Sequence, residues 1–557
     1  MNAAQRVTEV AEACWAIKLE DPYTRLSTGL PVTHIPAWSL DEAVRDETRA
    51  AALLARLQGL DDSALGESER LTLEFLRHDL GQMQQAVAIW QHASAVTPYA
   101  SMVHGYLAQR LLAPLPIDGA PALDRWAGLW SDLAAALRQV RARVLAQAAQ
   151  GRRLARPAIE PTLATWRHLQ RQLGALLTPS AATAATVHAD LQPRWQAQAE
   201  RLREREVLPA VQGVIDVLGD PAYRRAAPEA VGLMHQPGGE AEYRRLLVTH
   251  LTLPDDPQRI HDTGLDEVAR LAERMCEVRS RLGFDGAEGD FHAALRSNPR
   301  VIATSADDVA ARYMACMERL EPLLPRWFAR LPRSPYGVER LSPEQEAGMT
   351  YGYFDKPVAV GERGVYRFNA SNLEQRSQLQ VAALIYHELA PGHHFHLARQ
   401  MELDHLPALR RHALGLSVFN EGWAEYASGL AEEMGLYDDP YDLYGRLVHE
   451  RFVAQRLVVD TGLNALGWTL EQARAYMRKH TMEGEAQIAS ETLRYGTDMP
   501  AQALAYRLGY RAFMQLREDT RQRRGSSFDI REFHEAVLGE GALPIGTLRG
   551  HVERVMP

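Results

Sequence analysis

Cysteine is scarce in this 557-residue chain, and its scarcity limits the kinds of site that the protein can build. The three cysteines are Cys14, Cys276 and Cys316. Their odd number and wide spacing indicate neither a disulfide framework nor a cysteine zinc site. Any bound metal must therefore rely on histidine and carboxylate ligands.

Long apolar runs are also missing. No stretch of about 18 apolar residues occurs, so the sequence predicts no membrane-spanning helix. The first residues, MNAAQRVTEVAEACWAIKLEDPY, place charges inside their apolar pattern and lack the apolar core of a secretory signal. From these two absences we expect a cytoplasmic protein without a membrane partner.

Charge of one sign is not concentrated in any segment. The net charge is −9, with no basic tract suited to nucleic acid and no acidic tail. The composition, 46% hydrophobic and 24% charged, is typical of soluble globular proteins. We therefore expect no nucleic-acid partner, and the sequence does not indicate an oligomeric state.

Most of the chain has the periodicity of amphipathic helices. Segments 123–150 and 264–284 repeat apolar residues at intervals of three and four, with arginines between them. Segment 350–371 differs, because aromatic and β-branched residues surround its glycines and proline, which predicts a short hairpin. We expect a mainly α protein, a large helical fold with a deep cleft and a small β hairpin next to a metal-binding helix.

The length of the chain exceeds what one core usually supports, so two regions are expected. Proline and glycine are densest in segment 219–243. We place a soft boundary there, between an N-terminal helical region, 1–240, and a catalytic region, 241–557. A single interdigitated unit is the alternative.

The segment YHELAPGHHFH (386–396) resembles an interrupted form of the zinc-protease pattern H-E-x-x-H. Proline occupies position 391, where the second histidine would stand, and His393 and His394 follow. On a straight helix neither could share an ion with His387, but the Pro-Gly pair can kink or bulge the turn. We prefer His393 as the second ligand because it needs the smaller accommodation, with His394 as its substitute.

A third ligand is found downstream in FNEGWAEYASGL (419–430). A catalytic zinc site takes about three protein ligands and a water, and Glu421 is the natural third ligand. Glu425, one turn later on the same face, is placed to accept a hydrogen bond from the other ring nitrogen of a ligand histidine. The alternative for both glutamates is a solvated helix face.

Three blocks, HELAPGHH, NEGWAEYA and ETLRYGTDMPAQALAYRLGY (491–510), resemble a poorly characterised bacterial family of zincin-like proteins with an H-E-x-x-P-G-H-H signature. The resemblance extends over 242–271. It implies a mostly helical, cleft-containing fold akin to helical oligopeptidases, and metallopeptidase activity. The family usually has Pro-Gly-Gln where this chain has Pro-Ala-Gln, so a positive φ at Ala501 would be strained.

The sequence therefore predicts a hydrolase that binds one zinc ion per chain and cleaves short peptides. Glu388, next to His387, is the expected general base. Arg494, Tyr495 and Tyr506 are candidate donors to an oxyanion, and we favour Tyr506. A packed core role is the alternative for each tyrosine.

The predicted strand 364–369 would border the cleft and accept a peptide through its backbone groups. Tyr366, Asn369 and Gln502 are the expected substrate-binding residues. Alternatively, the hairpin only covers the core.

Two other functions use the same cluster. A non-catalytic binding protein would hold a structural metal, with His394 or His396 closing the fourth position. A hydrolase of non-peptide amides or esters would need the same machinery as a peptidase. The sequence does not distinguish exopeptidase from endopeptidase activity, and it does not identify the native metal.

Overall fold

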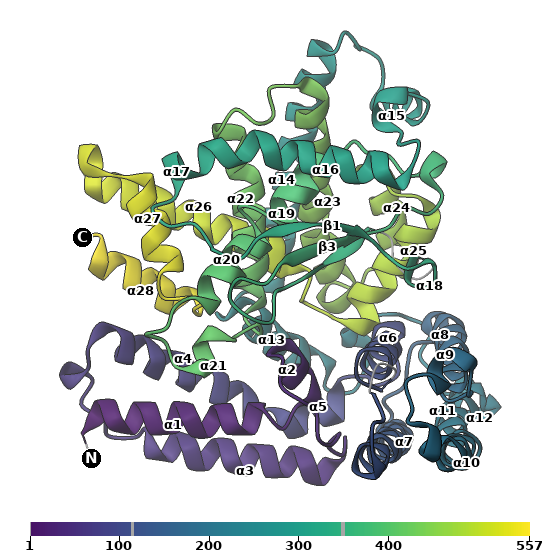
Figure 1. The fold of residues 1–557 in the computed structure, drawn as a ribbon. Coiled ribbons are helices and arrows are strands. Elements are labelled where there is room, and N and C mark those ends of the chain that lie inside the picture. Colours follow the sequence, from purple (N-terminus) through teal and green to yellow (C-terminus); the bar gives the residue numbers. More distant parts are fainter. Residues whose placement is uncertain (1, 113–115, 347–350) are drawn as a thin grey trace.

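The computed structural model describes residues 2–112, 116–346 and 351–557. Helices dominate, as the apolar periodicity predicts, and the mainly α fold class is confirmed. Figure 1 shows two tiers: the elements of the first 240 residues form the lower tier, and later helices with a small sheet form the upper one.

The lower tier begins with helices α1 and α3, which lie side by side, and continues into a further group of helices from α6 to α12 (Figure 1). Helix α7 contains all but the last residue of the predicted segment 123–150 and buries an apolar face that includes Trp126 and Trp130. The helices up to residue 251 are α1 (Ala3–Lys18), α2 (Pro22–Ser27), α3 (Leu40–Arg56), α4 (Glu67–Met83), α5 (Ala86–His92), α6 (Pro98–Leu107), α7 (Ala120–Ala149), α8 (Arg156–Leu176), α9 (Ala181–Ala184), α10 (Gln192–Leu202), α11 (Leu208–Gly219), α12 (Pro221–Arg225) and α13 (Gly239–Leu251).

The upper tier surrounds one central helix, α23, which is buried along nearly its whole length. Helix α14, which contains most of the predicted segment 264–284, packs along it. The helices of this tier are α14 (Pro257–Arg281), α15 (Glu288–Arg296), α16 (Ala306–Leu320), α17 (Leu324–Trp327), α18 (Pro343–Glu346), α19 (Val381–Glu388), α20 (His393–Met401), α21 (Ala408–Arg411), α22 (Ser417–Glu433), α23 (Pro440–Ala465), α24 (Leu470–His480), α25 (Glu485–Leu493), α26 (Leu504–Arg524), α27 (Ile530–Leu538) and α28 (Ile545–Val555).

The hydrophobic cores cross the boundary expected near residue 240. The largest core joins side chains between Val7 and Leu80 to others between Tyr243 and Met556. A second core lies mainly within residues 32–231 and reaches Leu493. The first helices therefore pack on the upper tier, and the two-region division stays a prediction beside the interdigitated alternative.

The sheet consists of β1 (Tyr336–Arg340), β2 (Gly352–Asp355) and β3 (Gly364–Phe368). Strands β2 and β3 form the predicted hairpin, and β1 pairs with β3 in parallel, so the order is β1-β3-β2. The prediction that strand 364–369 accepts a peptide is wrong for this arrangement, because both edges of β3 are already paired. Within the described part of the chain, β1 and β2 are the outer strands of this sheet.

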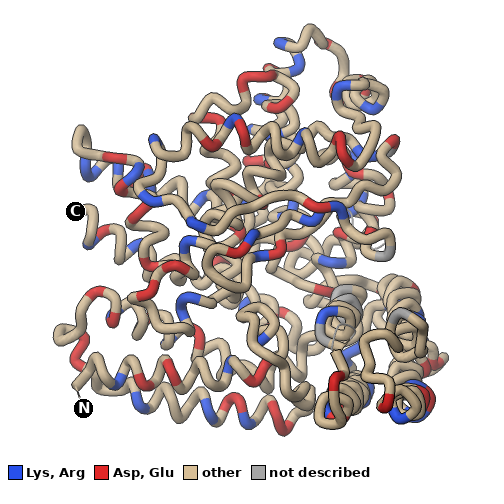
Figure 2. The backbone as a smooth tube through the Cα atoms, viewed as in Figure 1, with Lys and Arg blue, Asp and Glu red and all other residues tan. Residues whose placement is uncertain are grey.

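Charged residues of both signs alternate along the chain, as Figure 2 shows. This distribution agrees with the absence of a basic tract in the sequence. Among the residues that the structure describes, no helix combines the length and the apolar character needed to cross a membrane.

Helices α22 and α26 contact each other through two glycines. A Cβ atom built on Gly422 would lie 2.5 Å from the Cα atom of Gly509, which is too close for any side chain. The two backbones therefore touch. This contact fixes the separation of the helices that carry Glu421 and Tyr506.

Replacing Gly509 with alanine should destabilise the fold by about 1–3 kcal/mol, because neither backbone can yield without moving its helix. Urea denaturation measures the change. Gly128→Ala is the matched control: no atom lies within 4 Å of its built Cβ on helix α7, so alanine should stabilise by roughly 0.5–1 kcal/mol. Equal stability of Gly509→Ala and the parent would contradict the backbone contact.

Candidate metal centre

The histidine segment forms two helices rather than one kinked helix. Helix α19 ends at Glu388 and α20 begins at His393. Gly392 lies in the loop between them, where a built Cβ would come within 1.8 Å of the His387 carbonyl oxygen, so only glycine fits. The Trp423 indole N–H donates to the Pro391 carbonyl at 2.9 Å. The interruption is thus larger than the expected kink, and it is tied to helix α22.

This loop brings the three preferred ligands together. The Nε2 atoms of His387 and His393 lie 3.6 and 3.3 Å from Oε2 of Glu421. One donor atom from each of the three residues lies within 4.8 Å of the others. The Glu421 Oε2 atom is buried and has no hydrogen-bond partner, which leaves a carboxylate oxygen available to a cation between the imidazoles.

The neighbouring histidines point elsewhere. His394 is fully buried, and its Nε2 donates to the Ser334 carbonyl at 2.9 Å. Burial lowers the pKa of His394 to about 4, so its ring is neutral. His396 Nε2 lies 3.5 Å from His393 Nδ1. Of the two alternatives for the second ligand, the structure places His393 in the cluster and His394 against the segment that precedes β1.

Glu425 lies on the other side of the His387 ring from Glu421. Its Oε1 is 3.1 Å from His387 Nδ1, within ion-pair range but outside the geometry of an aligned hydrogen bond. Arg446 Nη1 donates to its Oε2 at 3.2 Å. One helical turn of α22 therefore places carboxylates at both nitrogens of a single imidazole.

These carboxylates set the protonation of the cluster. Burial alone would lower the pKa of His387, but the contacts with Glu421 and Glu425 outweigh it and raise the pKa to about 10. Burial opposes ionisation of Glu421, yet His393 and His387 hold its pKa far below the usual range. Without a metal, a proton on His387 balances the carboxylates, so protons and metal compete for this site.

His449 is a member of the site that the sequence pattern did not select. Its Nε2 lies 2.8 Å from Glu425 Oε1, and together with His387 it forms a second group of donor atoms within 4.8 Å. Arg446 already neutralises this carboxylate. We therefore assign the His449 group to orienting Glu425. The dipeptide His-Glu at this position has no second histidine in the next turns, so it carries no motif signal.

Glu388 follows His387 and is half-buried. Within the described ranges, its carboxylate forms no hydrogen bond or ion pair with another side chain. Burial raises the pKa of Glu388, against the opposing effects of His387 and His393. Its charge also contributes to the raised pKa of Tyr366, so the two groups are neighbours. The carboxylate is therefore available for proton transfer.

The three candidate oxyanion donors occupy different surroundings. The Tyr506 ring stacks on His387, with 6.2 Å between centroids and 10° between planes. The Tyr495 hydroxyl is buried, accepts from Arg456 at 3.0 Å and contacts Glu491. Arg494 donates to the Gln502 side chain at 2.9 Å. Tyr506 thus stands at the cluster, whereas Tyr495 and Arg494 belong to the network around Glu491.

The expected substrate-binding residues are held by the fold. Asn369 donates to the Glu346 carbonyl at 2.8 Å and lines a cavity of about 770 Å³ beside helix α19. Tyr366 is fully buried and meets Tyr313 edge-on at 5.4 Å. Gln502 is buried against Arg494. These contacts place Asn369 at a cavity and the other two in packing positions; their substrate contacts stay predictions.

Ala501 has a φ of +68°, so this chain keeps the left-handed backbone that glycine would favour at this position. Its N–H contacts both carboxylate oxygens of Asp460, at 3.1 and 3.0 Å. The Tyr243 hydroxyl donates to the same carboxylate at 2.7 Å. Burial raises the pKa of Asp460 to about 7 despite these donors. The hydrogen bonds compensate for the left-handed backbone that alanine rarely adopts.

Solved structures share this fold over its full length. A "putative lipoprotein" from Colwellia psychrerythraea aligns with a TM-score of 0.89 at 22% identity, covering 100% of this chain and 99% of the other. A "putative lipoprotein of unknown function" from Shewanella oneidensis aligns with a TM-score of 0.75 at 17% identity, covering 99% of both chains. These likenesses establish the fold alone.

No curated protein matches the sequence. One family model does, and it spans residues 22–552, nearly the whole chain. Its description is "Bacterial protein of unknown function (DUF885)". The chain belongs to this bacterial family, DUF885.

Proposed function

We propose that this chain is a metal-dependent hydrolase, with zinc as the ion and short peptides as the substrates. The observation that carries the proposal is the convergence of His387, His393 and Glu421, with the buried Oε2 of Glu421 left without a hydrogen bond. Two imidazoles and one carboxylate form a donor set that suits zinc. When bound, such an ion polarises a carbonyl group and lowers the pKa of a water ligand to about 7.

Glu388 is the proposed general base. It takes a proton from the attacking water and passes it to the leaving amine. Burial raises the pKa of Glu388 toward neutral pH. A carboxyl group with such a pKa can both accept the proton of the water and donate it to the amine. Tyr506 is the proposed oxyanion donor, since stacking against His387 and the Arg456 guanidinium 4.7 Å from its ring hold it beside the cluster.

The arrangement favours a catalytic site over a closed structural one. A structural zinc site fills its fourth position with protein. His394 donates to the Ser334 carbonyl and His396 faces His393, so neither belongs to the donor group of His387. Hydrolysis of non-peptide amides or esters would use the same groups, and a substrate screen separates these activities.

The two structural neighbours also bear on location. Both are described as lipoproteins, a class held at membrane surfaces by a lipid. We propose a location at the cell envelope in place of the cytoplasmic one expected from the sequence, which would give the enzyme access to peptides outside the cytoplasm.

Glu388→Gln keeps the size of the side chain but cannot accept a proton at neutral pH. We expect zinc-dependent hydrolysis of a short-peptide library to fall by about 10²- to 10⁴-fold, with zinc content unchanged. Rates and elemental analysis on the same preparation measure both. Glu277→Gln, an exposed glutamate far along helix α14, is the control and should keep full activity. Undiminished turnover by Glu388→Gln would remove the base from the mechanism.

His393→Ala and His394→Ala separate the two candidate ligands. Without His393 the site should lose zinc on dialysis, because one of three donors is gone. His394→Ala should keep zinc at one ion per chain but melt at a lower temperature, since it orphans the buried Ser334 carbonyl. Zinc loss from His394→Ala with retention by His393→Ala would reverse the assignment.

Zinc affinity should depend on pH. Because the pKa of His387 is about 10 without metal, binding at neutral pH displaces its proton. We expect the apparent affinity to rise by roughly tenfold per pH unit from pH 6 to 9, and to level off near pH 10. Titration calorimetry in two buffers of different ionisation enthalpy measures the proton release. Binding without proton release at pH 8 would contradict the protonated state of the metal-free site.

A further inference from the structure

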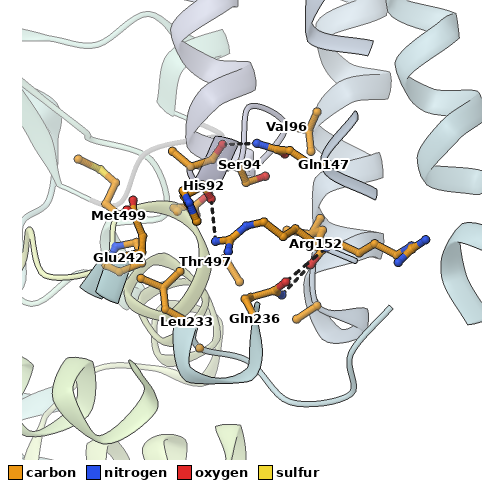
Figure 3. Close-up of a pocket in the computed structure, with 18 of the residues that line it drawn as sticks. His92, Ser94, Val96, Gln147, Arg152, Leu233, Gln236, Glu242, Thr497 and Met499 are labelled. Atoms are coloured by element: carbon orange, nitrogen blue, oxygen red, sulfur yellow. Dashed lines mark hydrogen bonds between the residues drawn. The ribbon is translucent and has the colours of Figure 1, made fainter. Parts of the chain in front are cut away.

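A second cavity lies far along the chain from the metal centre, where the second hydrophobic core meets the upper tier. It has a volume of about 250 Å³. Its walls come from the end of α5, from α7 and the loop after it, from α13, and from segment 496–500. None of its lining residues belongs to the His387 cluster. Figure 3 shows Arg152 reaching across this cavity toward His92.

Arg152 is only 6% exposed, and no carboxylate of the described residues lies within 4 Å of its guanidinium. Its donors reach only backbone carbonyls: Pro237, and His92 at 3.4 Å. Every other buried arginine of the described chain has a carboxylate partner; these are Arg279, Arg399, Arg410, Arg446, Arg451, Arg456 and Arg507.

Two acidic side chains line the same cavity, Glu242 and Asp498, and neither has a carboxylate oxygen within 4 Å of the Arg152 guanidinium. Arg245 holds both oxygens of Glu242, at 2.8 and 2.6 Å. A buried charge without a close partner is costly, and Glu242 acts on Arg152 only from beyond ion-pair distance, so a bound anion would supply the close counter-charge.

His92, which also lines the cavity, has a ring nitrogen without a hydrogen bond to any described residue. The Nδ1 atom of His92 is buried and forms no hydrogen bond within the described structure. Ser94, Gln147 and Thr497 add further polar groups to the wall, and Val96, Val144 and Leu246 supply an apolar side. The cavity thus combines a cation without a close carboxylate, the Asp498 carboxylate, an unused ring nitrogen and an apolar surface. A few polar groups on an apolar wall are the usual composition of a small-molecule site.

We propose that this cavity binds a small carboxylate ligand, whose anionic group pairs with Arg152 and accepts a hydrogen bond from His92 Nδ1. The planar guanidinium suits a carboxylate because it donates two parallel hydrogen bonds. The volume, below that of a drug-sized pocket, limits the ligand to about the size of an amino acid or a short dicarboxylate. The proposal does not depend on the hydrolase function.

Titration calorimetry of the full chain tests the site with three probes: succinate, L-glutamate and inorganic phosphate, against sodium chloride at matched ionic strength. We expect succinate or L-glutamate to bind at one molecule per chain. Arg152→Gln should weaken that binding by at least roughly tenfold, the loss expected for a charge-assisted contact. Arg152→Lys keeps the positive charge but not the two parallel donors of the guanidinium, so its affinity should lie between those of Arg152→Gln and the parent.

Arg143→Gln is the matched control. Arg143 lies on helix α7, shortly before the loop that carries Arg152, and donates to carbonyls of Ile89, Trp90 and Ala93, but it does not line the cavity. It should leave binding unchanged. Should Arg152→Gln fail to fold, Arg152→Lys and His92→Ala decide, and both should weaken binding. Equal binding by all variants, binding of phosphate alone, or no binding of any probe would overturn the proposal.

Discussion

The contact of one imidazole with two carboxylates, a buried one and a half-buried one, is the constraint on which the proposed metal centre depends. Glu421 and Glu425 lie one turn apart on α22 and face the two nitrogens of His387. Burying carboxylates costs several kcal/mol each unless positive charge accompanies them. Arg446 supplies that charge to Glu425, whereas the ion-pair partners of Glu421 among the described residues are the imidazoles of His387 and His393. A proton on His387 or a metal ion must provide the rest, and this need for positive charge is the reason why we propose a cation site here.

Long-range packing holds this charge cluster in place. Helix α23 contributes Arg446 and His449 from the centre of the molecule, and Arg446 continues through Glu450 at 3.9 Å to Arg507 at 2.7 Å. Negative and positive side chains alternate along this buried row of ion pairs, so each charge is balanced by its neighbour. The Gly422–Gly509 contact and the Trp423–Pro391 hydrogen bond then fix the helices that carry the ligands.

Local patterns predicted much of this arrangement. Helical periodicity, the hairpin and the stretched motif are properties of short segments, and they led to His387, His393 and Glu421 before any contact was known. Contacts between segments far apart in the sequence cannot be predicted from such local patterns. Strand β1 joins β3 from outside the hairpin, which closes the edge expected to bind peptide. His449 reaches Glu425 from another helix, and His394 turns to Ser334 because of packing that no motif encodes.

Anomalous X-ray scattering at the zinc absorption edge, from crystals of the zinc-loaded protein, tests the central claim most directly. We predict one strong peak bonded to His387 Nε2, His393 Nε2 and a carboxylate oxygen of Glu421, with ligand distances of about 2.0–2.2 Å and no fourth protein ligand. A peak between Glu425 and His449, a site closed by His394 or His396, or no peak in protein that elemental analysis shows to contain zinc would contradict the account.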